Sequence, residues 1–167
     1  MDTYLISHTS YLILMTIKEQ LMEKIKESMK AGTSDRTNIL RLAMNAIKNR
    51  EVENRGKGIE VELTDDDVID VLMKEVKRRN ESADVYTQAG RQELADVEIA
   101  EVAIIKEFLP EAISAEELDK IVTAAIAKTE AKEIKDMGKV MAEINPQIKG
   151  RADSKTVSDL IKNKLGL

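Results

Sequence analysis

The longest amphipathic segment of the chain is TDDDVIDVLMKEVKRRNESADVYTQAG, residues 64–90. Thr64 is a good helix cap, the three aspartates after it complement the positive end of a helix, and Gly90 is a typical helix stop. Its apolar residues recur three and four positions apart, the spacing of one helical face: Val68, Ile69, Leu72, Val76 and Ala83. The segment predicts a helix of about 25 residues that ends near Gln88.

Similar signals predict helices along the whole chain. Three more are expected before Pro110, over about 17–31, 34–55 and 94–108. Three shorter ones are expected after it, capped by Ser114 with Glu117, by Asp136 and by Asp153, the second running from Met137 to Ile144 because Asn145-Pro146 should end it. No segment alternates with a period of two. The expected fold is therefore all-α.

The expected helices fall into two groups. We expect a helical N-terminal domain over 15–109 with about four helices, two of them long, and a small three-helix domain over 110–167. Residues 1–14 differ in composition from the rest and are expected to be a disordered extension or a non-native start, which leaves His8 peripheral. Their apolar run is too short for a signal peptide or a membrane span.

The composition excludes many kinds of chemistry. The 167 residues include no Cys, no Trp and one His, and only 2% are aromatic. A thiol nucleophile, a cysteine metal site and a stacking platform for single-stranded nucleic acid are therefore not expected, nor are a bound metal or another cofactor. The net charge of −5 disfavours general binding to DNA or other polyanions, so any contact with RNA should be local.

Three motifs carry a family resemblance. They are Leu109-Pro110-Glu111 with Ser114-x-Glu116-Glu117-Leu118, then Asp136-Met137-Gly138-Lys139-Val140-Met141, and then Lys149-Gly150-Arg151-Ala152-Asp153-x-x-x-Val157. Together they resemble the YqeY family (GatB/YqeY). The C-terminal part is similar to the tail domain of the B subunit (GatB) of the glutamine-dependent amidotransferase that acts on Glu-tRNA(Gln) and Asp-tRNA(Asn).

The resemblance implies a two-domain helical protein of the cytoplasm, with tRNA, or a protein of tRNA metabolism, as partner and no membrane association. Family members often inherit the label of a carbon–nitrogen ligase with glutamine as amido-N-donor. The sequence has no P-loop, nucleophile elbow or Ser-Lys amidase arrangement, so we expect no catalytic residue and no such activity. The alternative to a tRNA-binding module is a protein-interaction adaptor that presents a face of its long helices.

The candidate phosphate-binding residues cluster near the last helix. Lys149, Gly150 and Arg151 combine two cations with a glycine that permits close backbone approach, just before a helix N-terminus. Lys155 and Lys139 extend the set. The alternative is a plain turn at Gly150 with Asp153 as helix cap and solvated basic side chains. Gly138 would serve either tight helix packing, which we favour, or backbone access for a ligand.

A second basic patch is expected on the long helices. Residues 36–57 carry six basic and two acidic residues, and Lys74, Lys77 and Arg78 share one helical face. If the two helices are neighbours, these side chains form a stripe suited to an RNA backbone; the candidates are Arg41, Lys48, Lys74, Lys77 and Arg78. The alternative, which we favour, is an ordinary surface on which acidic residues offset the basic ones.

Overall fold

A computed structural model describes residues 15–59 and 62–166 of the chain. Its regular structure within these residues consists of seven α-helices and one short 3-10 helix, so the predicted all-α class is confirmed. The expectation for residues 1–14, including His8, lies outside the described residues. The chain forms two compact units, unit 1 up to Leu109 and unit 2 from Pro110 onward.

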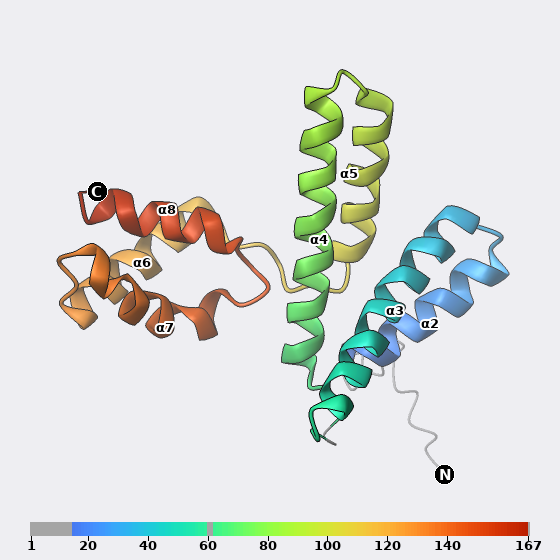
Figure 1. Cartoon of the computed structure of the whole chain (residues 1–167), viewed down its shortest axis with the longest axis horizontal. Coiled ribbons are helices and arrows are strands. Elements are labelled where there is room, and N and C mark those ends of the chain that lie inside the picture. Colours follow the sequence, from blue (N-terminus) through green and yellow to red (C-terminus); the bar gives the residue numbers. More distant parts are fainter. Residues whose placement is uncertain (1–14, 60–61, 167) are drawn as a thin grey trace, which may run out of the picture. The chain divides into compact units, whose positions relative to one another are not determined.

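Unit 1 contains four helices (Figure 1). They are α2 (Ile17–Lys30), α3 (Ser34–Gly56), α4 (Asp65–Gln88) and α5 (Gln92–Lys106). The most extensive packing is between α4 and α5, while α2 packs on α3, and α3 contacts both helices of the α4–α5 pair. The fourth helix ends at Lys106, slightly before the predicted stop at Leu109-Pro110.

The start of α4 follows the sequence prediction closely. The Thr64 hydroxyl accepts a hydrogen bond from the Asp67 N–H at 3.2 Å, and the Asp67 carboxylate accepts one from the Thr64 N–H at 3.0 Å. This reciprocal capping satisfies two backbone donors that have no partner inside the helix. The neighbouring Asp65 carboxylate accepts from the Ile17 N–H at 2.9 Å, which joins the start of α4 to the start of α2.

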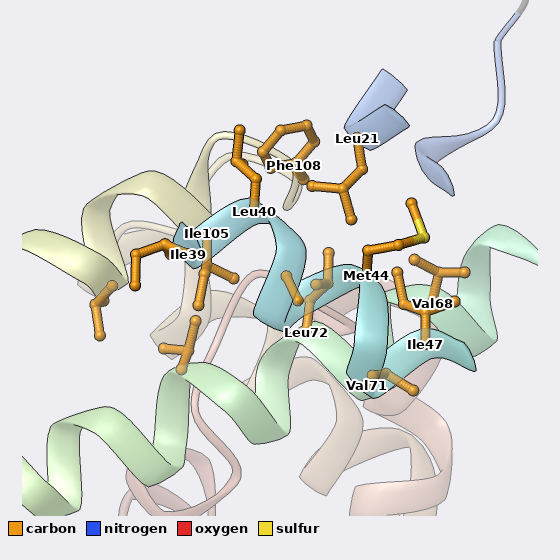
Figure 2. Close-up of a cluster of buried hydrophobic side chains, with 13 residues drawn as sticks. Leu21, Ile39, Leu40, Met44, Ile47, Val68, Val71, Leu72, Ile105 and Phe108 are labelled. Atoms are coloured by element: carbon orange, nitrogen blue, oxygen red, sulfur yellow. The ribbon is translucent and has the colours of Figure 1, made fainter. Parts of the chain in front are cut away.

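The core of unit 1 gathers side chains from all four helices. Leu40 of α3 and Leu72 of α4 are fully buried, and Ile105 and Phe108 close the cluster from the end of α5 (Figure 2). Burial of a side chain of this size contributes about 1.5–3 kcal/mol. The two long helices are therefore held by their apolar faces, and their charged faces remain on the surface.

Unit 2 contains three helices and one 3-10 turn. They are α6 (Ala115–Thr129), the 3-10 helix η1 (Ile134–Asp136), α7 (Met137–Ile148) and α8 (Ser154–Lys164). Each helix packs against the other two. The fully buried residues of this separate core are Val122, Val140, Ile144, Val157 and Ile161.

The predicted end of α7 at Asn145-Pro146 is wrong, because the helix continues through Pro146 to Ile148. Proline lacks an N–H, so its inclusion removes one hydrogen bond to the carbonyl of Ala142, a partly exposed residue whose carbonyl can turn to water. Ile148 is buried in the core one turn after Ile144. Burial of Ile148 offsets the lost hydrogen bond, a tertiary effect that the local sequence rule omits.

Candidate nucleic-acid interface

The α7–α8 loop, residues 149–153, is shaped by a turn at Gly150. Gly150 has a φ of 73°, a left-handed conformation that costs other residues energy. The Arg151 N–H then donates to the Ile148 carbonyl at 2.9 Å. Asp153 ends the loop as predicted, since its carboxylate accepts hydrogen bonds from the N–H groups of Lys155 and Thr156 at 3.0 and 3.1 Å and so caps α8.

The side chain of Arg151 is engaged in a network inside unit 2. One terminal nitrogen of its guanidinium lies 3.1 Å from both carboxylate oxygens of Glu117 on α6. Its Nε donates to the Glu111 carbonyl at 3.2 Å. The backbone takes part as well, because the Ile113 N–H donates to the Arg151 carbonyl at 2.9 Å. Arg151 therefore ties the segment before α6 to the loop before α8, and it is not the freely solvated side chain of the alternative interpretation.

Glu117 was expected to complete a capping box with Ser114, and only half of that box forms. The Ser114 hydroxyl accepts from the Glu117 N–H at 3.1 Å. The Glu117 carboxylate instead binds Arg151, 34 positions further along the chain. A charge-assisted contact with a guanidinium is stronger than a return bond to a backbone N–H, which explains the choice.

The other candidates of unit 2 differ in how much charge they present. Lys155 is exposed in the first turn of α8 and makes no ion pair within the described part of the chain. The Lys139 ammonium lies 3.0 Å from the Asp136 carboxylate. Lys149 is half-buried and has an interaction of its own. Lys155 is thus the candidate whose cation is most open to a phosphate.

Gly138, in the first turn of α7, is exposed, and a methyl group built on its α-carbon would meet no atom within 4 Å. The favoured interpretation, tight helix packing, is therefore wrong: α7 packs through its buried face, on which Val140 and Ile144 lie, and Gly138 points elsewhere. Asp136, just before it, accepts hydrogen bonds from the N–H groups of Lys132 and Glu133. These bonds and the Lys139 ammonium hold the pKa of the Asp136 carboxyl below its usual range.

The basic residues predicted on the long helices are all exposed on unit 1: Arg41, Lys48, Lys74, Lys77 and Arg78. Their helices, α3 and α4, are in contact, which is the condition on which the stripe depended. Lys77 approaches Glu81 at 3.9 Å. The stripe itself stays a prediction.

Between α3, α4 and α5 lies a pocket of about 360 Å³. Arg78 lines it together with three carboxylates, those of Glu75, Glu98 and Glu101. Three negative charges beside the Arg78 guanidinium make this part of unit 1 a poor site for a phosphate. Of the predicted basic residues, Arg78 is therefore the least suited to an RNA backbone.

Arg79 also lines this pocket and was missed as a structural residue in the sequence. It is 7% exposed, and its guanidinium binds Glu75 at 2.7 Å and Glu101 of α5 at 2.9 Å. Burial alone lowers the pKa of Arg79, but the hydrogen bonds and charges of the two carboxylates outweigh it, so the pKa lies above its ordinary value. A signal was available, because Arg79 occupies the apolar register of α4 between Val76 and Ala83.

Two structural features bear on other kinds of site. Within the described ranges, no three His, Cys, Asp or Glu side chains are grouped so that they would hold a metal ion. No helix in that part of the chain combines the length and apolar character needed to cross a membrane.

The fold and this surface define a class, a small all-helical protein of two units with a cationic loop in the second. The chain belongs to the family described as Yqey-like protein, whose pattern matches residues 18–165. The resemblance inferred from the three motifs is thereby confirmed.

Three relatives are similar to the chain. An uncharacterized protein of Schizosaccharomyces pombe is 30% identical over 91 residues, which are 54% of this chain and 70% of that protein. Altered inheritance of mitochondria protein 41, mitochondrial, of Pyrenophora tritici-repentis is 27% identical over 150 residues, 88% of this chain and 80% of that protein. A Glutamyl-tRNA(Gln) amidotransferase component from Sulfurisphaera tokodaii is 32% identical over 116 residues, 67% of this chain but 18% of that protein.

Proposed function

We propose that the chain is a non-catalytic module that binds tRNA through unit 2, with Lys155 and the α7–α8 loop as the phosphate-contacting surface. The observation that carries the proposal is the similarity to the amidotransferase component. It covers 67% of this chain, more than unit 1 alone contains, so the similarity includes parts of both units. Because only 18% of the amidotransferase component takes part, the similarity supports a shared binding part and gives no support for the activity of that whole protein.

The geometry of unit 2 supports one kind of RNA contact. Lys155 lies in the first turn of α8, where the helix dipole adds to its positive charge. Arg151 lies in the preceding loop, but Glu117 already occupies its guanidinium. A phosphate near α8 would therefore bind Lys155 directly, while Arg151 holds the loop in position. With few aromatic side chains, the protein would recognise the shape and backbone of folded RNA and not unstacked bases.

Binding of a folded tRNA transcript by the full chain, measured by fluorescence anisotropy over a series of salt concentrations, tests the proposal. We expect affinity to fall as salt rises, with a log–log slope of about 2–3 for the few phosphates that such a surface contacts. Duplex DNA of the same length is the control and should bind more weakly at each salt concentration, since its groove geometry differs from that of A-form RNA. Equal binding of both, or no binding at low salt, would contradict the proposal.

A second candidate function is a protein-interaction adaptor. It is favoured by three apolar side chains on the α4–α5 pair that are more than half exposed, those of Val85, Val97 and Ile99. Recovery of a stoichiometric protein partner without RNA, and loss of that partner on Val97→Glu, would favour the adaptor over the tRNA-binding module. The cytoplasmic location stays a prediction, because one relative is named as mitochondrial.

A further inference from the structure

The pocket of unit 1 contains charged and polar groups that the fold does not use. Its floor is Arg79, whose charge is balanced by Glu75 and Glu101. On its walls lie Arg78 of α4 and Glu98 of α5. Neither makes an ion pair with the other or with any residue in the described part of the chain, although both face the same space.

The third wall is polar as well. It is formed by Asn45 and Asn49 of α3, whose side-chain amides make no hydrogen bond within the described residues. An amide both donates and accepts hydrogen bonds, so these two residues can bind a polar group of either kind. Arg79 is held rigidly from below, which fixes the spacing between α4 and α5 and hence between Arg78 and Glu98.

We propose that this pocket binds a small zwitterion of the α-amino acid class. The guanidinium of Arg78 matches a carboxylate with two parallel hydrogen bonds, and the carboxylate of Glu98 matches an ammonium group. Asn45 and Asn49 contact the side chain of the ligand. The volume of about 360 Å³ lies at the lower end of the range for small-molecule sites, which suits a ligand of this size.

The charges of the pocket exclude other ligand classes. A phosphate or a dicarboxylate would meet the three carboxylates of Glu75, Glu98 and Glu101 and gain only one guanidinium that is not already neutralised. A simple amine would leave Arg78 without a partner. An apolar ligand would cover charged groups without replacing their hydrogen bonds to water.

The test is a titration of the full chain with each of the twenty free amino acids, followed by calorimetry or ligand-observed NMR. We expect one or more of them to bind at concentrations below about 10 mM. The N-acetylated form, which lacks the ammonium, and the C-terminal amide, which lacks the carboxylate, should each bind at least about tenfold more weakly. Binding of either analogue as tightly as the amino acid would overturn the proposal, as would no binding by any of the twenty.

Variants place the ligand in this pocket. Arg78→Gln and Glu98→Gln should each weaken binding by about tenfold or more, because each removes one of the two charge pairs. The matched controls are Arg55→Gln and Glu93→Gln, which alter exposed side chains of the same unit that do not line the pocket. Equal affinity in all four variants would overturn the proposal. The tRNA proposal concerns unit 2 and is tested separately.

Discussion

The guanidinium of Arg151 lies 3.1 Å from each carboxylate oxygen of Glu117, and this pair joins the α7–α8 loop to the first turn of α6. The most prominent cation of the loop is therefore part of the framework of unit 2. A phosphate that approached Arg151 would have to displace a carboxylate. This relationship moves the expected RNA contact from Arg151 to Lys155, which has no such partner in the described part of the chain.

Replacement of Arg151 should destabilise unit 2. Arg151→Ala removes the contact with Glu117 and the hydrogen bond to the Glu111 carbonyl, a loss of about 1 kcal/mol for a pair that is partly exposed. Hydrogen–deuterium exchange followed by mass spectrometry can measure this unit by unit. Exchange in α6 and α8 should rise about fivefold, with unit 1 unchanged. The control is Glu117→Gln, and unchanged exchange in both variants would show that the pair contributes nothing.

The two glycines of unit 2 should respond to alanine in opposite directions. Gly138→Ala should raise the free energy of unfolding by up to about 1 kcal/mol, because the site is helical, exposed and open. Gly150→Ala should lower it by about 1–2 kcal/mol, since the backbone there is left-handed. Urea denaturation followed by circular dichroism measures both. A loss of stability in Gly138→Ala would restore the packing interpretation.

The stability of unit 1 should depend on the ionisation of Glu107. Its carboxylate receives hydrogen bonds from the Arg36 guanidinium at 2.7 and 2.6 Å, and these hold the pKa of Glu107 below its ordinary value against the opposing effect of partial burial. A carboxyl whose pKa is lowered by folding stabilises the protein above its unfolded pKa, about 4.3, and this stability is lost as the pH falls through the folded value.

Thermal unfolding between neutral pH and pH 3 measures this effect. Glu107→Gln should be less stable than the parent protein near neutral pH, and the difference should shrink as the pH falls below about 4.3. Glu93→Gln is the control, because Glu93 is exposed and makes no ion pair within the described ranges. A difference between parent and Glu107→Gln that stays constant with pH would contradict the expected role of the ion pair.

Loss of the buried arginine should have a larger effect than loss of any other ion pair of unit 1. Arg79→Met leaves the carboxylates of Glu75 and Glu101 facing each other without a cation, a loss of roughly 2–3 kcal/mol for groups that are partly buried. The triple change Arg79→Met, Glu75→Gln, Glu101→Gln should recover much of that loss. Urea denaturation compares them. Equal destabilisation of the single and triple variants would mean that packing, and not charge, is the cause.

Local signals in the sequence predicted most of the fold. Caps such as Thr64 and Asp153 and glycine stops such as Gly90 act within one helical turn, so they are visible in a short window. The error at Pro146 has a different origin. Whether a helix continues through a proline depends on what its last turn buries, and the burial of Ile148 is a tertiary contact.

The candidate surface was harder to predict. The sequence shows the charge of Arg151 but not its partner, which lies 34 positions away in another helix. The same limit applies to the unit 1 pocket, whose lining comes from three helices. Gly138 showed the reverse error, because a glycine in a helix suggests packing, and only the position of the neighbouring helices shows that the site is open.

The binding of folded tRNA by Lys155→Glu, compared with the parent chain and with Lys30→Glu across a salt series, tests the tRNA proposal most directly. Lys30 is exposed at the end of α2, so its variant makes the same change of charge in unit 1. We expect Lys155→Glu to weaken binding by about tenfold and to reduce the salt slope by about one, while Lys30→Glu changes affinity much less. Equal affinity of the two variants, or an unchanged salt slope in Lys155→Glu, would contradict the assignment of the tRNA contact to unit 2.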